Sequence, residues 1–224
     1  MKLAILRFSL NSNSENNWYF LEKSINFPYI FTGFFMAHIR FRFPYDIAFY
    51  PKHYISHLLI AISVVVAFLG FLFPILKSYF GLHEIPLFLE TMPFLLGQIL
   101  LYQFLHGDIL HIAFNSYFLY QAGPEVEARM SRSEFVRFFL ANTLFVAGCL
   151  WFLSDGLTIG ISGFCMALLA YLYMDMRAIR HPMAWQILVM LIINILLWLT
   201  GNISFVGHAA GAFFGYIYWI YRRR

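Results

Sequence analysis

Residues 57–76 form a run of 20 residues that contains no Lys, Arg, Asp or Glu. A helix of that length rises about 30 Å, which matches the thickness of the hydrocarbon core of a bilayer. Apolar runs recur along the chain, in which 61% of the residues are hydrophobic and only 12% are charged. A soluble domain is roughly half apolar and a quarter charged, so this composition predicts a protein that folds in a membrane.

Six segments are expected to be transmembrane helices, which predicts an all-α, polytopic bundle without a second globular domain. The expected spans are residues 57–76, 109 to about 125–129, 134–153, 162–179, 185–199 and 205–221. Gly107 and Asp108 favour a break before the second span, with Asp108 as the N-cap of a helix from Ile109. Residues 94–105 are also apolar, but hydropathy alone does not distinguish a span from an interfacial segment there.

The first 52 residues are mixed in character. Their apolar part, residues 27–36, is about ten residues long, which is too short to cross a bilayer. We therefore expect residues 1–52 to be a cytoplasmic or interfacial segment that precedes a six-helix membrane domain of residues 53–224. No cleavable signal peptide is evident, because the apolar stretch after Lys2 is short and is interrupted at Arg7.

The basic residues predict the orientation in the membrane. With the N-terminus inside, alternation of the six spans places 14 of the 15 Lys and Arg residues on the cytoplasmic side, and only Lys77 falls outside. This distribution follows the positive-inside rule and predicts that both termini are cytoplasmic. The net charge of +4 therefore reflects topology, and no nucleic-acid partner is expected.

Four polar residues lie within the apolar spans or at their ends, where polar side chains are costly and are candidates for function. They are Ser162, His208, His111 and Asn115. Counted from the charged residue at the cytoplasmic end of each helix, they lie ~18–24 Å above the inner boundary. Three spans thus place polar groups at one level, roughly 10 Å below the outer surface, which predicts a water-filled cavity open to the outside.

Small residues form stripes on two of these spans. Such faces allow two helix backbones to approach closely. One stripe is Gly207, Gly211 and Gly215, and the other is Gly163, Ala167 and Ala170. Close packing of these two helices is expected to bring His208 within hydrogen-bond reach of Ser162.

Four motifs resemble those of the rhomboid intramembrane serine proteases. They are Gly160-Ile161-Ser162-Gly163 for G-x-S-G, His106 to Asn115 for H-x-x-x-x-H-x-x-x-N, Gly207 to Gly211 for G-H-x-x-G, and Glu127 to Arg129 for E-x-R. All four occur in the family's order and on the expected spans. The resemblance covers about residues 55–224.

The resemblance implies a six-helix core in which Ser162 is the nucleophile and His208 is the general base and then the general acid. It implies no cofactor. The implied substrates are membrane proteins with a transmembrane helix, cut near the outer membrane face within the lipid bilayer, at a site with helix-breaking residues. The compact size suggests a bacterial inner membrane as the host.

The resemblance also implies that His111 and Asn115 donate hydrogen bonds to the oxyanion, together with the backbone N–H of Ser162. These two side chains are i, i+4 neighbours on one helix face, and one such donor is typically worth ~2.7–4 kcal/mol in the transition state. Gly163 and His106 match supporting positions, His106 as a more structural one.

Two positions depart from the family pattern. Gly97 and Gln98 stand where many rhomboids have Trp-Arg, which leaves open how the first external loop is held. Met166 stands where many have an aromatic residue stacked on the catalytic histidine, which leaves open what orients His208.

Other interpretations of the same residues were weighed. Ser162 could bond back to its own helix, and His208 could be a hydrogen-bonded core histidine. Metal binding is disfavoured, because His106 and His111 are spaced i, i+5 and no H-E-x-x-H occurs.

The main alternative function is a non-catalytic rhomboid-like protein that binds membrane clients, although such relatives usually lack the serine or the histidine. A transporter is the third alternative, but no intramembrane carboxylate lies near His208 to act as a relay.

Overall fold

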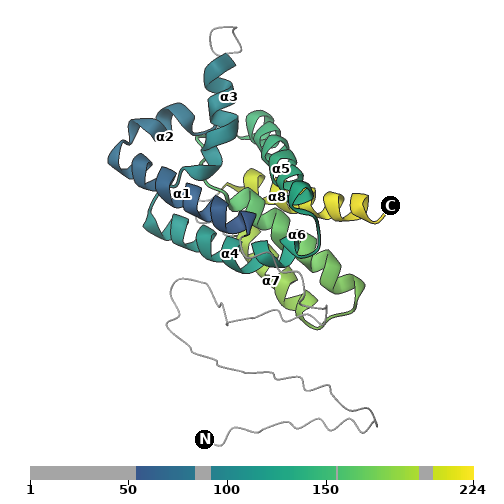
Figure 1. Ribbon diagram of the computed structural model, residues 1–224. Coiled ribbons are helices and arrows are strands. Elements are labelled where there is room, and N and C mark those ends of the chain that lie inside the picture. The colour runs from purple at the N-terminus through teal and green to yellow at the C-terminus, as the bar shows by residue number, and fades with distance from the viewer. Residues whose placement is uncertain (1–53, 84–91, 155, 197–203) are drawn as a thin grey trace, which may run out of the picture. The chain divides into compact units, whose positions relative to one another are not determined.

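A computed structural model describes residues 54–83, 92–154, 156–196 and 204–224, all within the compact unit Phe43–Arg224. The predicted N-terminal segment, residues 1–52, lies outside the described residues. In the described part, regular structure is helical apart from one isolated antiparallel bridge, so the all-α prediction is confirmed there (Figure 1).

The helices follow the predicted apolar segments closely. Their bounds are α1 Ile55–Leu72, α2 Ile75–Phe80, α3 Met92–Leu101, the 3-10 helix η2 Tyr102–Phe104, α4 Ile109–Glu127, α5 Arg132–Leu153, α6 Ser162–Ala178, α7 Met183–Leu196 and α8 Phe205–Arg222. Among the described residues, α1 and α5 are long and apolar enough to cross a membrane. The count of six spans stays a prediction.

The first predicted span differs from the observed helix. Helix α1 ends at Leu72, and the helical conformation is interrupted at Phe73 and Pro74 before α2 begins at Ile75. Proline disfavours the helical conformation in the residue that precedes it, and Phe73 accordingly leaves the helical region with φ −124° and ψ 80°. Lys77, expected in a hydrated loop, therefore lies on the short helix α2.

Helices α6 and α8 are packed backbone to backbone along the two predicted small-residue stripes. A Cβ atom placed on Gly211 would lie 1.9 Å from the carbonyl oxygen of Gly163, and one placed on Gly215 would lie 2.1 Å from that of Ala167. No side chain fits at those distances. A Cβ on Gly163 would also lie 3.2 Å from the Gly207 carbonyl oxygen, so the prediction that these stripes meet is confirmed at five of their six positions.

Charged residues join the C-terminal ends of α4, α6 and α8. Arg129, just after α4, donates from Nε to Asp175 Oδ2 of α6 at 2.8 Å. Arg222, at the end of α8, is paired with Glu134 of α5 and donates to the Arg129 carbonyl at 2.9 Å. Because these helices have similar lengths of 19, 17 and 18 residues, joining their C-terminal ends also brings their N-terminal ends to a similar level.

Helix α1 is held against α4 by a carboxylate. Glu127 accepts hydrogen bonds from the backbone N–H groups of Ile55 and Ser56 at 2.9 and 2.7 Å. These are unpaired donors of the first turn of α1, whose N-cap residue Tyr54 makes no side-chain capping bond. The contact is close, because a Cβ on Gly123 of α4 would lie 2.3 Å from Ser56 Cβ.

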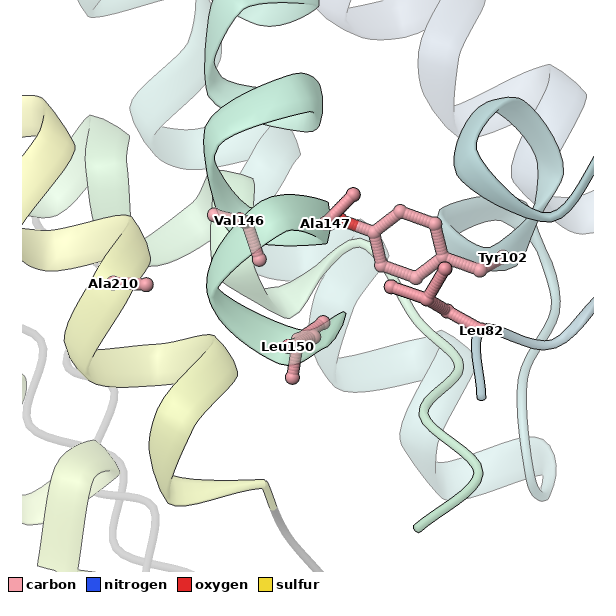
Figure 2. Close-up of a cluster of buried hydrophobic side chains, with 6 residues drawn as sticks. All are labelled: Leu82, Tyr102, Val146, Ala147, Leu150 and Ala210. Carbon is pink, nitrogen blue, oxygen red and sulfur yellow. The ribbon is translucent and has the colours of Figure 1, made fainter. Parts of the chain in front are cut away.

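An apolar cluster fills the space between α5, α8 and the region around η2 (Figure 2). It consists of Leu82, Tyr102, Val146, Ala147, Leu150 and Ala210. Leu82 and Tyr102 face Ala147 of α5, while Ala210 comes from α8, two residues after His208. The cluster thereby anchors the segments that flank the predicted site.

The close contact between α6 and α8 predicts a steep steric penalty at Gly211. Gly211→Ala is expected to lower the free energy of unfolding by about 1–3 kcal/mol, because the added methyl group forces two backbones apart. Reversible unfolding in mixed micelles measures this change. Gly148→Ala on α5 is the matched control, since a Cβ there meets nothing within 4 Å. It should be neutral or stabilise by up to about 1 kcal/mol, and equal losses in both variants would contradict the packing described.

Candidate active site

The predicted site residues lie at the N-terminal ends of three helices, of which α6 contacts both α4 and α8. Ser162 is the first residue of α6, His208 is in the first turn of α8, and His111 and Asn115 are in the first two turns of α4. The α4–α6 contact is made beside Ser162, where the Cys165 thiol donates to the Asn115 carbonyl at 3.7 Å.

Ser162 and His208 lie beside the contact between α6 and α8. Their chain neighbours meet directly, since a Cβ on Gly163 would lie 3.2 Å from the Gly207 carbonyl oxygen. His208 is 5% exposed, whereas Ser162 is half-buried and can be reached from outside the protein. Among the described residues, no hydrogen bond joins the two side chains, so the predicted dyad is a pair of neighbours in this structure.

The His208 ring is held by a backbone carbonyl of α7. Its Nδ1 lies 2.8 Å from the carbonyl oxygen of Asn194. A carbonyl oxygen only accepts hydrogen bonds, so Nδ1 carries the proton and Nε2 keeps its lone pair. Nε2 is thus the ring nitrogen that can accept a proton.

The carbonyl that holds His208 comes from the last described turn of α7, whose bounds are Met183–Leu196. The Asn194 side chain turns back to its own helix, where Nδ2 donates to the Met190 carbonyl at 2.8 Å. The question raised by Met166 therefore has a structural answer, because the ring is oriented by hydrogen bonding to α7.

His111 has the opposite tautomer. The backbone N–H of Gly107 donates to His111 Nδ1 at 3.4 Å, so Nδ1 is the acceptor and the neutral ring carries its proton on Nε2. That Nε2 lies 2.8 Å from the position of a Cβ on Gly160, two residues before Ser162. His111 therefore presents an N–H donor beside the G-x-S-G segment.

His106 fixes the orientation of Asn115. Its Nδ1 donates to the Phe104 carbonyl at 3.1 Å, and its Nε2 accepts from Asn115 Nδ2 at 3.1 Å. His106 lies in the loop between η2 and α4, where burial and the neighbouring His111 lower its pKa to about 3, so the ring is neutral. One of the two N–H bonds of Asn115 is thus occupied, and the amide nitrogen lies 3.5 Å from the Cβ position of Gly160.

The segment before Ser162 is shaped by Gly160. Its φ of +114° is rarely adopted by residues with a side chain, and a Cβ there would meet the His111 ring. Its N–H donates to the Tyr102 carbonyl at 2.9 Å. Two further backbone bonds, between Leu82 and Thr158 at 2.9 and 2.8 Å, tie the same segment to the chain after α2.

Helix α6 starts without a side-chain cap. Asp108, Ser131 and Ser204 cap α4, α5 and α8 through their side-chain oxygens, but the N-cap of α6 is Ile161. The backbone N–H groups of Ser162 and Gly163 have no hydrogen-bond partner among the described residues. They form a small positive site at a helix N-terminus, which favours a negatively charged oxygen.

The departure at Gly97 and Gln98 also has a structural counterpart. The Gln98 amide donates to the Tyr79 carbonyl of α2 at 3.4 Å and lies 3.3 Å from His83 Nδ1. A Cβ on Gly97 would lie 3.1 Å from the Phe80 ring, so α3 and α2 pack closely there. This contact holds residues 79–83 against α3.

Metal binding finds no support in the described part of the chain, where no three His, Cys, Asp or Glu side chains are placed to hold an ion. The two histidines of the first motif instead pack edge to face, with ring centroids 4.9 Å apart. Both rings already have hydrogen-bond partners.

Comparison with known proteins places these motifs in a family. The family model of the Rhomboid domain matches residues 95–224, which is more than half of the chain. The chain belongs to the rhomboid family. No individual curated protein matches it. Rhomboid proteins are integral to membranes and generally act as intramembrane proteases on transmembrane substrates, although non-catalytic members exist.

Sequence reasoning missed the groups that hold the site. These are the backbone carbonyls of Asn194, Phe104 and Tyr102 and the N–H of Gly107. Every residue carries such groups, so no residue type signals them.

The hydrogen bonds predict different tautomers for His208 and His111. Imidazole ¹⁵N NMR on histidine-labelled protein should show His208 protonated at Nδ1 and His111 at Nε2 at neutral pH. Spectra of His208→Ala and His111→Ala assign the signals. A His208 ring protonated at Nε2 would contradict the bond to α7.

The backbone of Gly160 predicts a second effect. Gly160→Ala should destabilise the protein by about 1–3 kcal/mol, because alanine is strained at this φ and its methyl group meets the His111 ring. Gly156→Ala, in the same loop, is the control, since a Cβ there meets nothing within 4 Å and its φ is unexceptional. It should shift stability by less than about 0.5 kcal/mol. Thermal unfolding compares the pair, and an unchanged Gly160→Ala would refute the strained geometry.

Proposed function

We propose that the chain is an intramembrane serine endopeptidase that cuts transmembrane-helix substrates near the outer membrane face, with Ser162 and His208 as its catalytic dyad. The observation that carries this proposal is the hydrogen bond from His208 Nδ1 to the Asn194 carbonyl at 2.8 Å. It leaves the Nε2 lone pair free, beside the first turn of α6, on a histidine whose ring is fixed.

In the first step, Ser162 Oγ attacks the scissile carbonyl carbon while His208 Nε2 takes the hydroxyl proton. The resulting imidazolium keeps its Nδ1–H bond to Asn194, so the protein holds the ring in one orientation as it becomes charged. A carbonyl dipole stabilises that charge, and no acidic third residue is needed for this orientation. This step requires the half-buried Ser162 hydroxyl to come within hydrogen-bond distance of the ring.

The carbonyl oxygen becomes an oxyanion in this step. Its donors are the unpaired N–H groups of Ser162 and Gly163, the Nε2–H of His111 and the second N–H of Asn115. These four groups all lie around Gly160, and donors fixed in advance stabilise developing charge without reorganisation. His106 acts through Asn115 and is a positioning residue.

When the tetrahedral intermediate collapses, the C–N bond breaks and His208 gives its proton to the leaving amine. An acyl-enzyme on Ser162 remains. Water then attacks this ester with His208 again as the base, and return of the proton to Ser162 Oγ releases the carboxylic acid. Because the peptide must be extended for attack, substrates with helix-breaking residues near the outer end of their span are favoured.

Two readouts test the dyad. Purified wild-type protein in liposomes should cut a transmembrane test substrate and be labelled at Ser162 by a fluorophosphonate. Ser162→Ala should lose both activities, and His208→Ala should lower the cleavage rate by at least about 10³-fold, as loss of a catalytic base does. Ser116→Ala is a folded control, because its hydroxyl lies elsewhere on α4 and makes no hydrogen bond among the described residues. Equal cleavage by Ser162→Ala would refute the proposal.

The alternative is a non-catalytic rhomboid-like protein that binds membrane clients. It predicts that the wild type binds a transmembrane peptide but neither cuts it nor reacts with the fluorophosphonate.

We further propose a bacterial inner membrane as the host, with both termini cytoplasmic. Labelling of Lys77→Cys and Arg224→Cys variants with a membrane-impermeant thiol reagent in intact cells distinguishes this orientation from its inverse, because only Lys77→Cys should react.

A further inference from the structure

Lys77 is connected to His111 by a continuous set of hydrogen bonds. Its ammonium group donates to the Gly107 carbonyl at 3.0 Å, and the Gly107 N–H donates to His111 Nδ1 at 3.4 Å. Asp108 adds a third bond, since its Oδ1 accepts from the His111 backbone N–H at 2.9 Å. A basic side chain on α2 thus reaches the loop that holds the predicted oxyanion donor.

The Lys77 side chain is itself held along its length. Its Cε and Cγ lie 3.5 and 3.7 Å from the position of a Cβ on Gly70, so its stem lies along the end of α1. Its ammonium group lies 4.6 Å from the centroid of the Phe71 ring, which is cation–π distance. These contacts restrain a long side chain that is otherwise flexible, so that it can hold an exposed loop in place.

Without Lys77, the hydrogen bond from Gly107 to His111 would be the weakest contact of this arrangement. Gly107 is exposed, and its 3.4 Å bond to His111 is long for an N–H donor. A bond from a charged donor to the carbonyl of the same residue restricts the loop and favours one orientation of its N–H. That N–H decides which nitrogen of His111 carries the proton.

We propose that Lys77 is a positioning residue that keeps His111 in the Nε2–H tautomer, with its donor directed at the oxyanion site. The inference rests on the proposed function. It also gives a role to the one basic residue that the charge pattern leaves on the outer side. Lys77 does not touch the reacting atoms, so its effect should appear in the rate of the chemical step and not in substrate binding.

Steady-state cleavage of a fluorogenic transmembrane substrate in liposomes tests this. Lys77→Met keeps the length and the apolar stem and removes the donor. It should lower kcat about five- to tenfold, as loss of one supporting hydrogen bond does, with KM unchanged. Lys77→Arg keeps a cationic donor and should recover most of the rate. A rise in KM with unchanged kcat, or a wild-type rate in Lys77→Met, would overturn the inference.

Arg177→Met is the matched control. Arg177 also donates one 3.0 Å bond and contacts an aromatic ring, both with Tyr173, but it lies near the C-terminal end of α6, away from the site. The control should keep the wild-type kcat. If both variants lose activity and melt at lower temperature in parallel, Lys77 acts through overall stability and the inference is wrong.

A double-mutant cycle separates positioning from a general structural role. In a His111→Ala background, Lys77→Met should have no further effect on kcat, because its target is gone. Additive losses would overturn the inference. These outcomes differ from failure of the proposed function, in which the wild type neither cleaves nor labels. A wild type that cleaves, together with Lys77 variants that do not differ from it, rejects the inference alone.

Discussion

The direct backbone contact between α6 and α8 is the constraint on which the arrangement of the site depends. Gly211 and Gly215 allow α8 to lie against the carbonyls of Gly163 and Ala167 without intervening side chains. Ser162 is next to Gly163 and His208 is next to Gly207, and these two glycines also meet, so the separation of the two side chains is set by helix packing. At the opposite ends, Trp219 Nε1 of α8 donates to Asp175 of α6 at 3.2 Å and Arg222 donates to the Tyr171 hydroxyl, which limits how far the two helices can slide. The distance between α6 and α8 and their register along the interface are therefore controlled by different interactions.

The helix positions, the Asp108 cap of α4 and the small-residue stripes could be predicted from the sequence, because apolar length, Asp before a helix and small-residue spacing each have a direct physical meaning. The end of α1 before Phe73 was not predicted, although Pro74 indicates it. The prediction rested on the absence of charged residues, and by that criterion residues 57–76 form one span. The partners of the site side chains could not be predicted. They are backbone groups, and their identity depends on which chain segments meet, not on residue type.

The two histidines of the site are distinguished by those backbone groups alone. Asn194 offers a carbonyl to His208 Nδ1, and Gly107 offers an N–H to His111 Nδ1. The same side chain is thereby set as a proton acceptor in one place and as a donor in the other. For the buried His208 ring such an assignment is stable, because a buried polar group without its partner is costly. The sequence motif specifies where the histidines lie, and the fold specifies what each can do.

Helix α7 therefore matters to the site although it contributes no side chain to it. It contacts both α6 and α8, and its final turn supplies the carbonyl that holds the His208 ring. A helix end inside a membrane protein leaves carbonyls that must find donors, since lipid provides none. Here the Asn194 carbonyl of α7 accepts from the imidazole N–H of His208, so one helix orients the ring on another. A shift of α7 along its axis would move that carbonyl and turn the ring, while leaving Ser162 in place.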